Sequence, residues 1–210
     1  MDPLRILYAV FLFGVNIPKG RSLSTAELRR VGTVLQPALV LRKIVGDTDN
    51  ILLELSSPQT ESSVRSIIEC ALNIRCVAIG VETLRIIVNR ALQAIQRPGI
   101  RLIPPYRETI TGAEWEFGVV LSSEPLPSTI ETSQLLFEPT KNAVPLEIIA
   151  ERALLARKRC KTESGSRIMF GSTLIKPWES ILGKNGIHPN CLTSRSLNRL
   201  EEVVKQASSL

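Results

Sequence analysis

The chain has 210 residues, of which 44% are hydrophobic and 4% aromatic, which indicates a globular protein with a largely aliphatic core. Its 26 basic residues exceed its 20 acidic residues, and the net charge of +6 is compatible with nucleic acid or another anionic partner. The four cysteines form no Cys-x-x-Cys pair and the chain has one histidine, which argues against a zinc site.

The N-terminal stretch predicts a strand followed by a helix. Residues 6–13 form an unbroken apolar run, which is typical of a strand covered on both faces. Ser24 is the expected N-cap of the helix, and Glu27, three residues later, completes a capping box. The apolar spacing that follows suits one buried helix face.

Further elements follow in the first half of the chain. Strands are expected at residues 38–44, 51–55 and 75–79, and helices at residues 60–72 and 82–96. The order up to residue 79, βαββαβ, predicts a ferredoxin-like domain. On the helix at residues 60–72, Cys70 shares a predicted apolar face with Ile67, Ile68 and Ala71, so we expect it in the core.

The second half begins after a stretch rich in proline and glycine. We expect an N-terminal half over residues 1–97, a linker over 98–113 and a C-terminal half over 114–210. A strand is predicted at residues 114–122, and helices are predicted at residues 129–137 and 174–182, the latter with Trp178 buried.

Two segments of the second half are harder to interpret. Residues 144–155 have helical propensity, which we favour over a pair of strands. Residues 156–161 read ARKRCK, the densest basic run, which is either a phosphate-binding patch or, as we favour, a solvated helix end. The last helix is expected to be capped by Ser194 and to run to about Ala207.

The stretch FGVNIPKG at residues 13–20 is followed by STAELRRVGTVL, and CLTSRSLNRLEEVV occupies residues 191–204. These two motifs resemble the opening and the closing segment of the family called domain of unknown function 1697, an uncharacterised bacterial-type family. A third family marker falls at residues 44–50 and keeps only Asn50. The resemblance implies the same α+β architecture of two related ferredoxin-like halves with antiparallel sheets.

The two matching motifs are polar segments that we expect at or near helix starts. Free N–H groups at helix N-termini favour anions. A ligand-binding site is therefore predicted near these residues: Asn16, Lys19, Arg21, Thr193, Ser194, Arg195 and Asn198. The alternative is that these residues cap helices and lock the two halves together.

No catalytic motif is present, and His188 has no carboxylate or cysteine beside it. Our first hypothesis is a non-enzymatic binding module for nucleic acid or another anionic partner. The second is an enzyme acting on a small phosphorylated or acidic substrate held between the halves, and the third is an interaction protein. We expect no cofactor. We also expect no membrane partner and a cytoplasmic location, because no apolar segment is long enough to span a bilayer.

The predicted first sheet invites comparison with RNA-recognition domains, which stack bases on aromatic side chains of two central strands. The first strand carries Tyr8, Phe11 and Phe13, but the predicted third strand carries no aromatic residue. Half of such a stacking platform is therefore missing.

Overall fold

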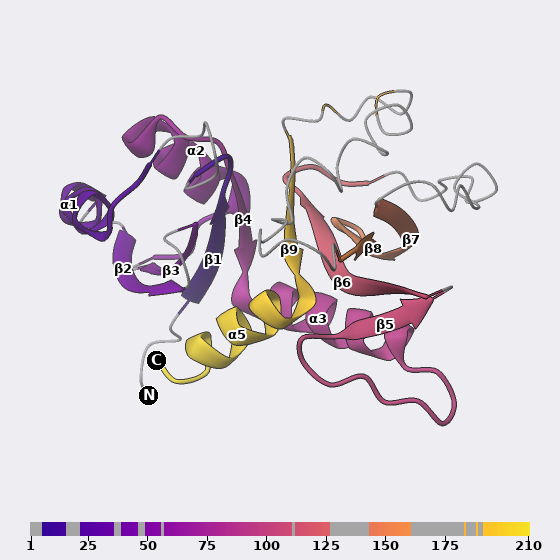
Figure 1. Cartoon of the computed structure of the whole chain (residues 1–210). Coiled ribbons are helices and arrows are strands. Elements are labelled where there is room, and N and C mark those ends of the chain that lie inside the picture. The colour runs from indigo at the N-terminus through magenta and orange to yellow at the C-terminus, as the bar shows by residue number, and fades with distance from the viewer. Residues whose placement is uncertain are drawn as a thin grey trace. The chain divides into compact units, whose positions relative to one another are not determined.

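The computed structural model describes residues 6–15, 22–35, 39–45, 49–55, 57–110, 112–126, 143–160, 183, 188 and 191–210. The fold is mixed α+β, with two antiparallel sheets and, among these residues, four helices (Figure 1). The chain divides into two compact units. The first unit comprises Met1–Arg85 and Glu201–Leu210, and the second comprises Ile86–Leu200.

The first unit has the strand and helix order that the sequence predicts. Its elements are β1 (Ile6–Leu12), α1 (Thr25–Leu35), β2 (Leu39–Val45), β3 (Asn50–Leu55), α2 (Glu61–Leu72) and β4 (Cys76–Gly80), and α3 (Val81–Ile95) follows. The spatial order of the strands is β2-β3-β1-β4, and every neighbouring pair is antiparallel. The apolar run of β1 therefore lies inside the sheet, as its lack of alternation indicates.

Helices α1 and α2 cover the same face of this sheet. Leu28 of α1 and Val64 and Ile68 of α2 are buried in one cluster with Tyr8 and Val10 of β1. These side chains recur at helical spacing on the helices and at alternate positions on β1, so each element contributes one apolar face. This packing stabilises the first unit through burial of apolar surface.

Both helices begin at capped residues. The backbone N–H of Glu27 donates to Ser24 Oγ at 3.1 Å, and the N–H of Ser24 donates to Glu27 Oε2 at 2.7 Å, which is the predicted capping box. At α2 the N–H of Ser63 donates to Thr60 Oγ1 at 3.2 Å. The predicted capping box of α1 is therefore confirmed, and α2 has a comparable cap at Thr60.

Replacing Ser24 with alanine is expected to lower the free energy of unfolding by about 1 kcal/mol, because the N–H of Glu27 loses its acceptor. Urea denaturation of the two proteins measures this difference. Ser24→Thr keeps the hydroxyl and should stay within about 0.5 kcal/mol of the wild type. Equal losses for the two variants would show that the hydroxyl does not act as the cap.

Cys70 is exposed, so the prediction that it packs in the core is wrong. The buried residues of α2 are Val64, Ile68 and Leu72, which recur every four residues. This stripe is narrower than the apolar face of the sequence, because Ala71 is also exposed and Ile67 is only half-buried. Cysteine and alanine are small enough to be left outside a core at little cost.

Asn50 is the first residue of β3. Its side chain is buried, and Nδ2 donates to the backbone carbonyl of Val45 at 3.1 Å and to Asp49 Oδ1 at 2.6 Å. The amide therefore fastens the end of β2 to the start of β3.

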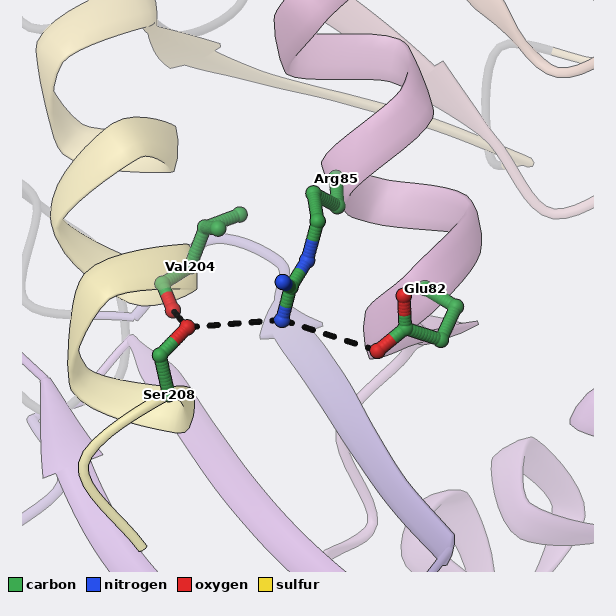
Figure 2. A network of polar contacts seen from close by, with 4 residues as sticks. All are labelled: Glu82, Arg85, Val204 and Ser208. Carbon is green, nitrogen blue, oxygen red and sulfur yellow. Dashed lines mark hydrogen bonds and ion pairs between the residues drawn. The ribbon is translucent and has the colours of Figure 1, made fainter.

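The part of α5 (Leu197–Ala207) from Glu201 onward and the residues after it belong to the first unit. Figure 2 shows Arg85 of α3 between Glu82 and Ser208. Arg85 Nη2 donates to Ser208 Oγ at 3.3 Å and lies 3.5 Å from Glu82 Oε1, and Ser208 Oγ donates to the Val204 carbonyl at 3.0 Å. These contacts connect the start of α3 to the C-terminal end of α5.

The second unit contains a five-stranded sheet. Its strands are β5 (Arg107–Ile110), β6 (Ala113–Ser122), β7 (Ala143–Ala150), β8 (Ala153–Arg159) and β9 (Leu192–Ser196). The division between the units falls inside α3 rather than at residues 98–113, where a linker is predicted. Residues 107–110 of that stretch form β5, which pairs with the first four residues of β6.

Residues 144–155 form strands rather than the favoured helix, so that prediction is wrong. They contribute most of β7 and the first residues of β8, which pair as a hairpin with a turn at residues 151–152. Helical propensity differences amount to at most about 0.7 kcal/mol per ordinary residue. Pairing of β8 with both β6 and β7, together with burial of Leu154 and Leu155, outweighs them.

The second sheet repeats the strand order of the first. β6 lies between β8 and β9 as β1 lies between β3 and β4, and β7 pairs with β8 as β2 pairs with β3. β5 is an additional strand of the second sheet, and a helix directly follows the last strand of each sheet, α3 after β4 and α5 after β9. The helices predicted at residues 129–137 and 174–182 lie outside the described residues. No helix in the described part of the chain is long and apolar enough to cross a membrane.

Candidate functional site

Only part of the predicted ligand-binding set lies in the described structure. Asn16, Lys19 and Arg21 fall outside the described residues, and Asn198 is the second residue of α5. Thr193, Ser194 and Arg195 lie in β9 and not at a helix start, so the prediction that Ser194 caps the last helix is wrong. The reason is tertiary, because these residues pair with residues 119–121 of β6 and the helix starts only at Leu197.

Antiparallel pairing sorts the side chains of the second sheet onto two faces, because residues directly opposite each other point to the same side. Trp115 and Phe117 of β6 share one face with Arg157, which is opposite Phe117, and with Arg195, which is opposite Val119. We call this the arginine face. Glu116 and the opposite residue Lys158 point to the other side, which we call the lysine face.

The arginine face holds a buried cluster at the end of the sheet where β5 pairs with β6. The guanidinium carbon of Arg157 lies 5.1 Å from the centre of the Trp115 ring, within the range of a cation–π contact. Glu108 is opposite Trp115, and its Oε1 lies 2.7 Å from Arg97 Nη1. Its Oε2 lies 3.9 Å from Arg157 Nη1. Two arginines therefore share one carboxylate beside an aromatic ring.

Three polar atoms of this cluster are buried without a hydrogen-bond partner in the described structure. They are the N–H donors Arg157 Nε and Trp115 Nε1 and the acceptor Glu108 Oε2. Trp115 is 5% exposed and Arg157 is 9% exposed, so neither donor is free to bond to bulk water. A buried donor without an acceptor costs about 1–3 kcal/mol. The cluster is therefore a place where a bound molecule would recover lost hydrogen bonds.

Burial also affects the charge of this cluster. It lowers the pKa of the Arg157 guanidinium, an effect that the nearby Glu108 carboxylate opposes and the charge of Arg97 reinforces. Arginine remains charged at neutral pH because its pKa is so high. The cluster thus keeps two positive charges against one negative charge.

Arg195 and Thr193 lie on the same face, toward the other end of β6. Arg195 Nη1 donates to Thr193 Oγ1 at 2.7 Å and to the Ser194 carbonyl at 2.8 Å. Arg195 is buried, and its contacts hold the guanidinium against its own strand. The structure therefore brings Thr193 and Arg195 together and directs Ser194 to the lysine face.

The lysine face carries charges that balance in the described strands. Lys158 Nζ lies 3.9 Å from Glu116 Oε2, and Arg107 Nη1 donates to Glu114 Oε1 at 3.2 Å. Burial raises the pKa of Glu116, which Lys158 and Arg107 oppose, and burial lowers the pKa of Lys158, which Glu116 opposes. Two cations face two carboxylates here, which suits a structural network better than capture of an anion.

The aromatic residues of the first strand do not form a base-stacking platform. The ring of Tyr8 is in the helix-covered core, and its hydroxyl donates to the Gln59 carbonyl at 2.7 Å. Phe11 is fully buried, and Phe13 is half-buried. Stacking of bases requires exposed rings. Among the described residues, no group of histidine, cysteine, aspartate and glutamate is placed to hold a metal ion.

The basic run at residues 156–161 is the sequence feature that points to Arg157 and Lys158. The expectation that this run is a solvated helix end is wrong for its first four residues, which belong to β8. In a strand, alternation directs Arg157 and Arg159 to one face and Lys158 to the other. No pattern in the sequence shows that Glu108 and Arg97 come beside Arg157, because strand pairing and a long loop bring them there.

Comparisons with known proteins inform the fold alone. No protein-family model and no curated protein matches the chain. Among solved structures, the chain is similar to the conserved bacterial protein SP0830 from Streptococcus pneumoniae, with a TM-score of 0.51 and 11% sequence identity. The match covers 96% of this chain and 98% of that one. At this identity the likeness shows a shared fold and carries no function across.

Proposed function

We propose that this chain is a binding protein whose arginine face holds a small anionic ligand. The observation that carries the proposal is the pair of buried, unpartnered N–H donors, Arg157 Nε and Trp115 Nε1. A carboxylate or phosphate oxygen is the natural acceptor for such donors, and its hydrogen bond to a guanidinium is charge-assisted. Binding would relieve the desolvation cost of both donors at once.

The distribution of charge on the second sheet supports an anion. In the described strands the arginine face carries Arg157, Arg159 and Arg195 against Glu108 and Glu147. Arg97 adds a fourth cation through its contact with Glu108. This face therefore has an excess of positive charge, whereas the lysine face is balanced.

A small ligand fits these observations better than nucleic acid. Nucleic-acid grooves use exposed cations along a backbone and exposed rings for stacking. The cluster offers buried donors instead, next to Arg97, whose side chain is 60% exposed and marks the side open to solvent. Binding of nucleic acid is one of the results that the experiment below distinguishes.

The test is calorimetric titration of the whole protein with inorganic phosphate, sulfate and citrate, compared with the Arg157→Met variant. We expect binding of at least one anion to the wild type and a loss of at least about tenfold in affinity in the variant, because a charge-assisted hydrogen bond is removed. Methionine keeps an unbranched apolar chain over the Trp115 ring. Circular dichroism verifies that the variant is folded.

Arg107→Met is the matched control, because Arg107 is also an arginine paired with a glutamate but lies on the lysine face. It should leave anion affinity unchanged. Absence of binding by every anion, or equal losses in the two variants, would refute the proposal. Binding of labelled RNA or DNA that weakens linearly with salt on logarithmic axes and persists in Arg157→Met would favour nucleic acid instead.

We also propose that both units are ferredoxin-like and that the chain is a divergent member of the domain of unknown function 1697 family. The repeated strand order, β2-β3-β1-β4 and β7-β8-β6-β9, supports the first statement. The motifs at residues 13–20 and 191–204 support the second. A cytoplasmic location is supported by the four free cysteines.

A further inference from the structure

The unpartnered cluster on the arginine face includes an acceptor as well as donors. Glu108 Oε1 is engaged by Arg97 Nη1 at 2.7 Å, whereas Oε2 is buried and accepts no hydrogen bond in the described structure. Arg157 Nη1 is 3.9 Å from Oε2, which is too long for a hydrogen bond. Arg97 thus holds the Glu108 carboxylate through Oε1, and Oε2 is left to accept a hydrogen bond from a bound molecule.

The three unpartnered atoms belong to neighbouring residues grouped around Arg157. Arg157 touches both other residues, since its guanidinium is over the Trp115 ring and its Nη1 is the atom facing Glu108. A molecule that satisfies all three atoms must therefore be compact. It must accept hydrogen bonds from Arg157 Nε and Trp115 Nε1, and it must donate one to Glu108 Oε2.

We propose that the arginine face selects hydrogen phosphate, an oxyanion that carries its own O–H group, over an equally charged oxyanion that carries none. This rests on the proposed anion-binding function and makes Glu108 the residue that determines specificity. Hydrogen phosphate has oxygens to accept from the two donors and a hydroxyl to donate to Glu108. Sulfate has the same tetrahedral shape but would direct only lone pairs at the carboxylate.

The size of the discrimination follows from the chemistry of the mismatch. With sulfate, Glu108 Oε2 stays buried without a donor and also faces negative charge. Sites built to hydrogen-bond a substrate hydroxyl reject analogues that lack it strongly, because their buried polar groups are left unpaired. We expect phosphate to bind at least about tenfold more tightly than sulfate.

The experiment compares inorganic phosphate with sulfate by calorimetry of the whole protein at constant ionic strength. A mildly alkaline pH is used, where both ions carry two negative charges. The Glu108→Gln variant is then measured in the same way. Glutamine keeps an acceptor for Arg97 and replaces the other oxygen with an N–H₂ donor, so the preference for phosphate should disappear or reverse in favour of sulfate.

The outcomes separate this inference from the proposed function. Phosphate and sulfate binding equally well to the wild type, both dependent on Arg157, would overturn the inference and leave the proposed function intact. If neither phosphate nor sulfate binds, the inference is overturned. If citrate also fails to bind, the proposed function is overturned as well, and a single buried water would then satisfy the three atoms. A Glu108→Gln protein that is folded and still prefers phosphate would remove Glu108 from the selection. If that variant does not fold, the wild-type ratio alone decides.

Discussion

Replacing Lys158 with methionine is expected to lower the free energy of unfolding by about 3 kcal/mol, the lower end of the range for breaking a buried ion pair. Lys158 is 3% exposed, and its ammonium faces the carboxylate of Glu116, whose side chain is 15% exposed. Removing the lysine leaves that carboxylate poorly hydrated beside an apolar side chain. Arg107 still attracts it, which is why we expect the lower end. Urea denaturation at neutral pH measures the loss.

The double variant Lys158→Met/Glu116→Gln tests the cause. It removes both charges, so it should recover most of the stability lost in the single variant, because a buried pair exchanged as a whole is close to neutral. A single-variant loss below about 0.5 kcal/mol, in the range of ordinary surface substitutions, would show that the pair does not matter for stability. A double variant as unstable as the single one would mean that Lys158 acts through packing.

The stability lost in Lys158→Met should also depend on pH. Burial already raises the pKa of Glu116 above its usual 4.5, and loss of Lys158 raises it further. Between 4.5 and that raised value the folded variant binds more protons than the unfolded chain, so its stability falls as pH rises. The deficit relative to the double variant should be largest at neutral pH and shrink toward pH 4.5.

Replacing Ile68 with alanine is expected to lower the free energy of unfolding by about 2–5 kcal/mol. Ile68 is completely buried on α2, in the cluster that joins both helices to the first sheet. Truncation removes three carbon atoms and leaves a cavity that the rigid elements around it can fill only in part. Chemical denaturation gives the loss, provided that the slope of the unfolding free energy against denaturant is unchanged.

Cys70→Ala is the matched control on the same helix. Cys70 is exposed, so its loss should change stability by less than about 0.5 kcal/mol. Similar losses for the two variants would contradict the assignment of the buried stripe to Val64, Ile68 and Leu72. The comparison of the two variants therefore also tests whether Cys70 lies outside the buried face of α2.

The first half of the chain was predictable because its signals are local. The unbroken apolar run of β1, the capping box of Ser24 and Glu27 and the apolar stripe of α2 each act within a few residues. The second half of the chain was less predictable, because the residues of β7 and β8 have helical propensity that strand pairing overrides. Interpreting ARKRCK as a helix end followed from that first error.

The candidate site shows the same division. Arg195 and Thr193 were predicted, although for a helix start that is in fact a strand. Arg157 lies in a basic run whose pattern favours a solvated helix end, and no motif of the sequence points to Glu108, Arg97 or Trp115. Their roles depend on the register of β5 and β8 against β6, which no short-range pattern encodes.

The sequence by itself determined the α+β class, the element order of the first unit and the cap of α1, because propensity, periodicity and capping act between neighbouring residues. Only the tertiary structure decided that residues 156–159 of the basic run belong to a central strand, with Arg157 and Lys158 on opposite faces. It also decided that two donors and one carboxylate oxygen are left buried without partners. The physical reason is that burial and hydrogen-bond satisfaction belong to the packed arrangement of distant segments, and a change of one residue in strand register would exchange the two faces.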